Sequence, residues 1–322
     1  MTTKILSFGE ALIDFLSNGA IKKGELETFT KFPGGAPANV AVAAALLGGD
    51  SHFVGQVGDD AFGHFLKDEL EGYGVKTDSM LMTSDAKTAL AFVSLDETGE
   101  RSFEFYRNPS ADMLFKSEDF SSAWFESAKG VFHTCSNTLT DENITAATMT
   151  GIELAKAANW VVSIDVNLRT NLWPNNTVDT ARVITWMQTA DVVKASLEEL
   201  SVLASDPYAL IQESLEKGVA VFVLTDGSNP VRYYTSTDKG EVQTPKVDVK
   251  DTTAAGDAFV GGLLYQLAEQ GGDRASVQSL SQAQLHNIVR FAVACGADSV
   301  TRLGAYPSLP NLEQVEARLT QT

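Results

Sequence analysis

The segment at 251–259, which reads DTTAAGDAF, carries the residue types in this 322-residue chain that are best suited to phosphate chemistry. It follows a short strand-like run at 247–250 and precedes an amphipathic helix whose end is marked by the glycine pair at 271–272. Three small residues occupy the start of this predicted helix: Ala254, Ala255 and Gly256. Free backbone N–H groups at a helix N-terminus, together with the helix dipole, attract an anion without any lysine.

Asp257 lies in the first turn of the same predicted helix. A carboxylate at that place is stabilised as an anion, so it stays deprotonated at neutral pH. Beside an anion cradle it is able to accept the proton of a hydroxyl group during phosphoryl transfer. The spacing also allows the plainer interpretation that Asp257 only caps the helix.

A second polar group gathers near the N-terminus, in the segment PGGAPANVAV at 33–42. The pair Gly34-Gly35 lets a ligand approach the backbone closely, and Asn39 projects from the first helical turn beside it. Asp14 follows the first predicted strand, at the edge where α/β sheets bind ligands. A carboxylate and an amide together suit neighbouring sugar hydroxyls, although Asp14 alone is equally well explained as a turn or cap residue.

Two arginines accompany these polar positions. In SIDVNLR at 163–169, the two-residue period of a strand places Asp165, Asn167 and Arg169 on one face. Arg107 closes the run FEFYR. A planar guanidinium is suited to a hydroxyl or a phosphate oxygen, and the alternative for either arginine is a surface salt bridge.

Short apolar runs that alternate with helix-like segments must position these residues. The predicted strands are residues 4–9, 51–55, 130–134, 160–165, 191–195 and 219–225. The predicted helices are residues 38–47, 61–72, 141–158, 179–188, 197–204, 208–217, 257–270 and 284–298. Continuously apolar strands are typical of a parallel sheet buried on both faces, so the pattern predicts a doubly wound α/β fold.

Two stretches break this rhythm. Residues 87–107 alternate apolar and polar side chains on both sides of a glycine-containing turn at 97–100, which is typical of a β-hairpin. Residues 15–33 are polar and also hairpin-like. The simplest model joins both into a small antiparallel sheet that projects from the main domain as a lid, and the alternative is two surface hairpins without a role.

The composition limits the class of partner. With 44% hydrophobic and 20% charged residues the chain can bury an ordinary core, as two domains or one large α/β domain with an appendage. The net charge of −18 disfavours nucleic acids and anionic membranes, and the long uncharged stretch at 32–49 holds too many glycines and prolines for a membrane span. Cys135 and Cys295 lie in apolar runs and are interpreted as buried free thiols, which fits a reducing cytoplasm.

Several well-known site motifs are missing. The sequence has no GxxxxGK[ST] loop, no GxGxxG fingerprint, no HExxH and no GxSxG. The 4 histidines are scattered and form no metal-ligand pattern. These absences disfavour a P-loop nucleoside triphosphatase, a Rossmann dehydrogenase, a zinc protease of the HExxH type and an α/β-hydrolase.

Two signatures together carry a family resemblance. The first is GGAPANVAVAAALLG followed by FVGQVGDDAFG at 53–63, and the second is DTTAAGDAF. With both in this order, the chain resembles the ribokinase-like (PfkB) carbohydrate kinases, and within them the bacterial fructokinases. The resemblance runs from about Lys4 to Pro310, which is nearly the whole chain.

The resemblance implies a Rossmann-like three-layer αβα core with a mainly parallel sheet and a β-sheet lid, built as one kinase domain over residues 1–322. It implies transfer of the γ-phosphoryl group of ATP to a sugar hydroxyl, with Asp257 as general base and the start of its helix as anion hole. The sugar-contacting positions correspond to Asp14, Gly34, Gly35 and Asn39, with Arg107 and Arg169 reaching over the sugar or the phosphate. The nucleotide-binding positions correspond to Lys194, Ser196, Thr225, Gly227 and Gly256.

Metal ions also follow from the resemblance. Glu199 corresponds to the glutamate of an NxxE element that organises Mg²⁺ through water, with Ser196 in place of the asparagine. Positions that often surround a monovalent cation such as K⁺ correspond to Asp251, Thr253, Ser299, Gly304 and Ser308. The chain departs from the family at Asn229-Pro230, where a glycine is usual, and at Val293, where an adenine-side asparagine is frequent.

The expected reaction is therefore phosphorylation of D-fructose by MgATP. Two alternatives stay open: a 2-dehydro-3-deoxygluconate kinase, for which Arg107 or Arg169 would serve as the extra cation, and a non-catalytic sugar or nucleotide sensor on the same scaffold. The sequence leaves open which hydroxyl is phosphorylated and how selective the nucleobase site is. Apolar residues near Phe92, Phe103 and Phe105 suggest a homodimer that pairs through the lid.

Overall fold

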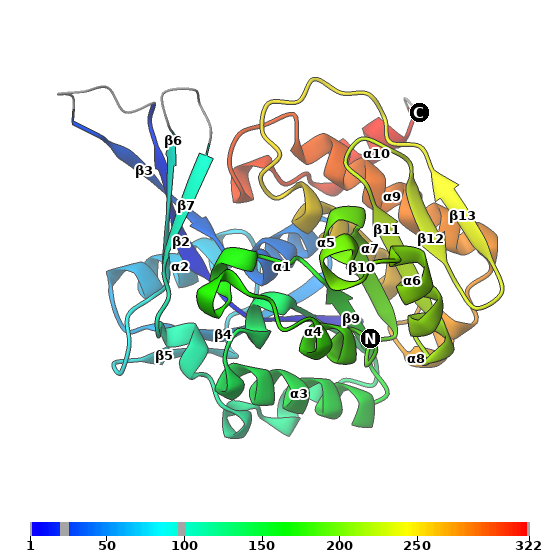
Figure 1. Ribbon diagram of the computed structural model, residues 1–322, viewed down its shortest axis with the longest axis horizontal. Coiled ribbons are helices and arrows are strands. Elements are labelled where there is room, and N and C mark those ends of the chain that lie inside the picture. The colour runs from blue at the N-terminus through cyan, green and yellow to red at the C-terminus, as the bar shows by residue number, and fades with distance from the viewer. Residues whose placement is uncertain (1, 20–25, 96–100, 321–322) are drawn as a thin grey trace.

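A nine-stranded sheet forms the centre of the molecule, and helices cover both of its faces (Figure 1). The computed structural model describes residues 2–19, 26–95 and 101–320. The strand order is β13-β12-β11-β10-β9-β8-β1-β4-β5, parallel from β11 to β5, with β12 and β13 antiparallel at one edge. The strands are β1 Lys4–Phe8, β4 Asp50–Gly58, β5 Met80–Thr83, β8 Gly130–Cys135, β9 Val161–Asp165, β10 Val192–Ser196, β11 Val221–Thr225, β12 Val231–Tyr234 and β13 Lys239–Val242.

The two faces of the sheet pack against different helices. On β1, Leu6 and Phe8 lie in one apolar cluster with α3 to α6, whereas Ile5 lies in another with α1, α7 and α9. This alternation follows from the two-residue period of a strand, and it confirms the predicted α/β fold with a mainly parallel sheet. The helices are α1 Ala36–Leu46, α2 Ala61–Gly72, α3 Glu142–Ala157, α4 Thr180–Met187, α5 Leu197–Leu203, α6 Pro207–Glu216, α7 Ala255–Glu269, α8 Arg274–Gln278, α9 Gln282–Ser299 and α10 Leu312–Leu319.

A smaller sheet of order β3-β2-β6-β7 projects from one side of the main body (Figure 1). Its strands are β2 Leu12–Ser17, β3 Phe29–Gly34, β6 Leu90–Leu95 and β7 Arg101–Tyr106. The antiparallel pairs β2–β3 and β6–β7 are the hairpins expected at 15–33 and 87–107, and β2 joins them by pairing parallel with β6. The expected turn at 97–100 lies outside the described residues.

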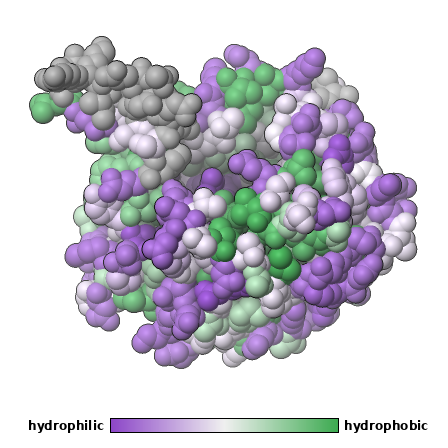
Figure 2. All heavy atoms as spheres, viewed as in Figure 1, coloured by the Kyte–Doolittle hydropathy of each residue, from purple (hydrophilic) through white to green (hydrophobic). Residues whose placement is uncertain are grey.

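The structure differs from the sequence prediction in several elements. The predicted strand at 247–250 is wrong, because the chain there is an irregular segment that crosses from β13 toward α7. The strands β5, β12 and β13 and the helices α8 and α10 lacked a strong enough pattern to be predicted. Among the described residues, no helix is both long and apolar enough to cross a membrane. Hydrophilic residues cover much of the face in Figure 2, in keeping with the net charge of −18.

Candidate active site

A cavity of about 560 Å³ lies between the carboxyl ends of the central strands and the small sheet. Most of the residues singled out in the sequence line it: Asp14, Gly35, Asn39, Arg107, Asp165, Asn167, Arg169, Lys194, Ser196, Glu199, Thr253, Ala254, Gly256 and Asp257. Others lie outside its lining: Gly34, Thr225, Gly227, Asp251, Ala255, Ser299, Gly304 and Ser308. The fold therefore gathers side chains from both signatures around one space.

The start of α7 forms one wall of this cavity. Ala254 precedes the helix in a left-handed conformation (φ 59°), which turns the chain into the first helical turn. The Ala255 amide donates to the Thr252 carbonyl (3.2 Å), whereas the described structure gives the amides of Gly256 and Asp257 no backbone acceptor, so these two are available to an anion. Gly256 lies close to Lys194: a Cβ added to this glycine would stand 3.5 Å from Lys194 Nζ. The sequence predicted an anion cradle that works without a lysine. In the structure, however, the buried Lys194 faces this cradle.

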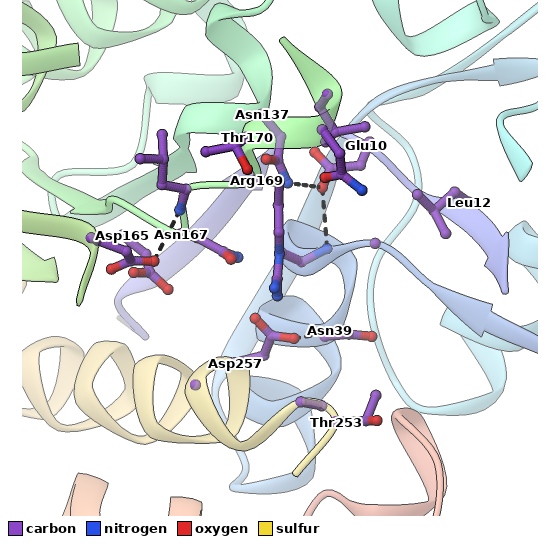
Figure 3. A pocket seen from close by; sticks show the side chains of 18 of the residues that line it. Glu10, Leu12, Asn39, Asn137, Asp165, Asn167, Arg169, Thr170, Thr253 and Asp257 are labelled. Carbon is purple, nitrogen blue, oxygen red and sulfur yellow. Dashed lines mark hydrogen bonds between the residues drawn. The ribbon is translucent and has the colours of Figure 1, made fainter. Parts of the chain in front are cut away.

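Asp257 lies beside Asn39 at the centre of the cavity wall (Figure 3). Its Oδ2 accepts a hydrogen bond of 2.7 Å from Asn39 Nδ2. Burial raises the pKa of Asp257, and the Asn39 bond and the charges of Arg169 and Lys194 oppose that rise. A buried carboxylate with raised proton affinity is a better proton acceptor than an exposed one. The bond to Asn39 fixes its orientation toward the cavity.

Asp14 has a higher pKa than an ordinary aspartate. Burial, and then the nearby charge of Asp257, raise its pKa to about 7, while Arg169 acts in the opposite direction. The adjacent Gly34 must be small, because a Cβ there would stand 2.1 Å from Asp14 Oδ2. The cavity therefore holds a cluster of carboxylates whose mutual repulsion a polar ligand would relieve by donating hydrogen bonds.

We expect Asp14→Asn to stabilise the ligand-free protein at pH 8 and to leave its stability almost unchanged at pH 4. A carboxyl whose pKa is raised on folding contributes stability below the unfolded value near 4, and this contribution is lost as the pH rises through about 7. Asparagine does not titrate, so the variant escapes that loss. Thermal unfolding at both pH values measures the effect, and a Tm at pH 8 below that of the wild type would contradict it.

Gly35 joins β3 to α1 in a conformation that glycine favours (φ 101°). A Cβ at this position would approach the Glu10 carbonyl oxygen to 2.5 Å. We expect Gly35→Ala to raise the KM for any substrate that binds in this cavity at least tenfold, because the strained turn would displace Ala36 and Asn39, which line the cavity. Steady-state kinetics measures this, and an unchanged KM would show that the turn tolerates the strain without moving.

Lys194 is held by acidic neighbours. Its Nζ lies 2.9 Å from Asp165 Oδ1, and both side chains are buried. Burial alone would lower the pKa of Lys194, but the charges of Asp165 and Glu199 outweigh it and raise the pKa. Lys194 therefore stays cationic at the cradle. Ser196 caps α5, and Glu199 accepts hydrogen bonds from the amides of Ser196 (2.6 Å) and Leu168 (2.9 Å), which fixes the carboxylate at the cavity rim.

The two arginines occupy different surroundings. Arg107 is buried and donates to Asp112 (2.6 Å) and to the Asn137 carbonyl (2.9 Å), so it forms an internal ion pair in the cavity wall. Arg169 instead reaches toward Asp257 and Asn39 (Figure 3). The two-residue period predicted for 163–169 is wrong, because β9 ends at Asp165 and Asn167 has a positive φ of 36°. All three predicted side chains still line the cavity.

Sequence reasoning missed several residues of the cavity, and Glu10 and Asn137 are the two that bond to each other. Glu10 Oε1 accepts hydrogen bonds from Asn137 Nδ2 (2.8 Å) and from the Ala36 amide (3.3 Å). The atoms Glu10 Oε2, Asn39 Oδ1 and Asn137 Oδ1 are buried without a hydrogen-bond partner in the described structure. Buried acceptors without a partner are costly, so these atoms are suited to ligand hydroxyls. One sign of the role of Glu10 was present in the sequence, because this charged residue comes directly after the apolar strand at 4–9.

Comparisons with known proteins agree with this geometry. The family model of the pfkB family carbohydrate kinases matches residues 2–312. The chain belongs to the pfkB family of carbohydrate kinases. It is 41% identical to probable fructokinase-7 of Arabidopsis thaliana, over 99% of this chain and 93% of the relative. A crystal structure of ATP-bound fructokinase from Xylella fastidiosa superposes with a TM-score of 0.94 at 46% identity, over 100% of this chain and 99% of that chain.

A third relative is a double mutant of fructokinase from Vibrio cholerae O395, whose crystal structure has fructose, ADP and potassium ion bound. It superposes on this carbohydrate kinase with a TM-score of 0.86 at 34% identity, covering 99% of this chain and 98% of that chain. The shared family and fold extend over the whole cavity, including the starts of α1 and α7.

The predicted nucleotide and cation positions of this carbohydrate kinase lie next to the cavity. Thr225 ends β11 in register with Ser196 on β10, and Gly227 follows it with a positive φ of 55°. In the loop before α7, Asp251 accepts hydrogen bonds from Thr253 (2.7 Å) and from the Gly304 amide (3.0 Å), so three predicted cation positions meet.

The other two predicted cation positions bond elsewhere. Ser299 donates to the Gly296 carbonyl, and the Ser308 carbonyl accepts from Arg302 (2.8 Å). Among the described residues, no group of three or more His, Cys, Asp or Glu side chains could hold a metal ion by itself.

Proposed function

We propose that this carbohydrate kinase transfers the γ-phosphoryl group of ATP to a hydroxyl of D-fructose. The observation that carries the proposal is the grouping of Asp257, Asn39 and Lys194 around the start of α7. It places a proton acceptor, its orienting partner and a cation at one anion cradle. The relatives named as fructokinases, one bound to ATP and one to fructose and ADP, support the choice of substrates.

In this mechanism Asp14, Gly35 and Asn39 hold the sugar hydroxyls, and Asp257 takes the proton from the attacking oxygen. The amides at the start of α7 stabilise the charge that develops on the transferred phosphoryl group, assisted by Lys194 and Arg169. These groups are already fixed by the fold, so little reorganisation is needed at the moment of transfer. The proton acceptor lies within the cavity rather than at its rim, as the reaction requires.

The charges of the cavity favour a neutral sugar over an acidic one. Arg107 is paired with Asp112 in the cavity wall, and Lys194 faces the anion cradle at the start of α7, which leaves Arg169 among the described lining residues as the cation available to a substrate carboxylate. Carboxylates outnumber cations in the lining: Glu10, Asp14, Asp165, Glu198, Glu199 and Asp257. An acidic sugar such as 2-dehydro-3-deoxygluconate would meet repulsion there, whereas fructose would donate its hydroxyls to these oxygens.

The small sheet acts as a lid in this proposal. Leu12, Leu16, Val93 and Phe105 of the sheet line the cavity, where their apolar side chains would exclude water from the reaction. Phe92 stacks on Phe15 and contacts Phe29 and Tyr106, and Tyr106 is exposed. This aromatic cluster supports the proposal of a homodimer through the lid, which light scattering tests. The side chain of Phe103 lies outside the described structure.

The cofactors proposed are Mg²⁺ with ATP and a monovalent cation such as K⁺. Mg²⁺ supplies charge neutralisation on the phosphates, and Glu199 is the residue that would hold it through water. The loop formed by Asp251, Thr253 and Gly304 supports the K⁺ proposal, as does the potassium ion in the Vibrio relative. The two buried free thiols, Cys135 and Cys295, support a cytoplasmic location.

ATP consumption over a panel of sugars tests the proposal. With MgATP we expect fructose to give kcat/KM at least tenfold above 2-dehydro-3-deoxygluconate and ribose, with little consumption when sugar is omitted. A preference for the acidic sugar would show that the substrate is 2-dehydro-3-deoxygluconate rather than fructose, and the assignment as a sugar kinase would stand. Tight sugar binding without any ATP consumption would instead favour a sensor, and would contradict the proposed function.

A further inference from the structure

The signature FVGQVGDDAFG at 53–63 takes no part in the chemistry above, although two of its polar residues are well ordered by hydrogen bonds. Gln56 lies in β4 and Asp60 caps α2, so both belong to the main body. Asp60 contacts Thr88, two residues before β6, and Gln56 contacts Ala111, five residues after β7, so both hold segments that flank the β6–β7 hairpin, the half of the lid that carries Val93 and Phe105. The motif therefore lies where the lid leaves and rejoins the core.

Asp60 holds the point at which the hairpin leaves the core. Its Oδ1 accepts from the amides of Phe62 (3.0 Å) and Gly63 (2.9 Å), which caps the helix. The same carboxylate accepts from the amide (3.0 Å) and the hydroxyl (2.8 Å) of Thr88, two residues before β6. Burial would raise the pKa of Asp60, but these hydrogen bonds outweigh it and lower the pKa. Asp60 thus stays charged and bridges core and lid.

Gln56 holds the segment that follows the hairpin, five residues after β7 ends. Its Nε2 donates to the Ala111 carbonyl oxygen (2.8 Å), and the Gln56 side chain is buried. The Ala111 amide donates to the Lys87 carbonyl (2.9 Å), so the departing and returning chains are also bonded to each other. Gln56 and Asp60 belong to one motif. Asp60 bonds to the departing segment at Thr88, and Gln56 bonds to the neighbouring returning segment at Ala111.

The glycines of the motif make this arrangement compact. The Gly58 amide donates to the Thr88 hydroxyl (3.1 Å), and a Cβ on Gly58 would approach Asp60 Oδ2 to 2.5 Å and the Thr88 amide to 2.7 Å. A Cβ on Gly63 would stand 2.0 Å from the Gly58 carbonyl. Neither position has room for a side chain. The two glycines therefore allow the motif to pack closely against Thr88.

We propose that Gln56 and Asp60 clamp the two chain segments that flank the β6–β7 hairpin and are positioning residues that fix Val93 and Phe105 over the sugar. This inference rests on the proposed function for its kinetic part. The clamp acts at the base of the hairpin, where a small displacement is carried along the whole strand to the residues that line the cavity. Losing it is expected to weaken sugar binding and to leave the nucleotide side, built on β10, α5 and α7, unaffected.

The variant Asp60→Ser separates the clamp from the helix cap. Serine caps a helix about as well as aspartate but is too short to keep the bonds to Thr88. Asp206→Ser is the matched control, because Asp206 caps α6 through the same two-amide pattern and does not touch the lid. Thr88→Val removes the hydroxyl contact from the opposite side, and Thr88→Ser retains it.

We expect Asp60→Ser and Thr88→Val to raise the fructose KM about tenfold, as two lost hydrogen bonds of ordinary strength imply, with the ATP KM within twofold of the wild type. Deuterium exchange without ligand should be faster in 90–95 and 101–106 for these variants and unchanged for both controls. If Asp60→Ser matches Asp206→Ser in exchange, or keeps the wild-type fructose KM, the proposal is overturned. If the wild type consumes no ATP with fructose, the proposed function fails, and the exchange result alone decides on the clamp.

Discussion

Asp257→Asn lowers kcat by about 100- to 10,000-fold while ATP and fructose still bind, if the carboxylate is the general base. The substitution keeps the shape of the side chain and its contact with Asn39, so the cavity is not reshaped. It removes the proton acceptor, whose affinity for a proton is raised by burial. Isothermal calorimetry measures binding and a coupled assay measures turnover, so the two effects are separated.

The control for this variant is Asp206→Asn, an equivalent substitution at an exposed helix start that does not contact the cavity. It should retain wild-type turnover. A kcat for Asp257→Asn within about threefold of the wild type would exclude Asp257 as the base, since removal of a general base has a far larger effect.

Lys194→Met is expected to have the largest effect on stability, about 3–5 kcal/mol, because it leaves Asp165 buried without its partner. It should also raise the ATP KM strongly, since the cation facing the start of α7 is gone. Urea unfolding at pH 8 measures the first effect and steady-state kinetics the second. Unfolding at the same urea concentration as the wild type would show that the ion pair does not hold Asp165.

The double variant Lys194→Met/Asp165→Asn distinguishes the two roles of Lys194. Removing both charges eliminates the uncompensated carboxylate, so part of the lost stability should return. The ATP KM should stay high, because neither residue now offers a cation to the phosphates. Recovery of the ATP KM together with stability would mean that Lys194 acts only through the fold.

Local patterns in the sequence were sufficient for the fold and for the cavity wall at the start of α7. The apolar strand runs predicted a parallel sheet because its strands are buried on both faces, as β1 shows with Ile5 and Leu6 in different clusters. Asp257 and the small residues before it were found because a helix start is a local feature. The run at 247–250 failed because an apolar alternation of four residues carries little information without a partner strand.

Contacts between distant segments could not be read from spacing. Glu10 and Asn137 are separated by 127 positions and meet only because β1 and β8 are neighbours in the sheet. The sequence predicted that Arg107 contacts the substrate, but in the structure its guanidinium forms a buried ion pair with Asp112. Asp60 was visible as part of a motif, but its partner Thr88 lies 28 positions away at the base of another sheet. Each of these three contacts depends on tertiary packing. A periodic pattern predicts a helix or a strand, but it does not show which distant residues come into contact.

Phosphorus-31 NMR of a mixture of the protein, MgATP and D-fructose tests the central claim most directly, because it identifies the acceptor of the phosphoryl group. The γ-phosphate signal of ATP should disappear as a sugar phosphomonoester signal of equal intensity appears, and Asp257→Asn should abolish both changes. Conversion of the γ-phosphate to inorganic phosphate, or no change over many hours with the wild type, would contradict the assignment of a sugar kinase that acts on fructose.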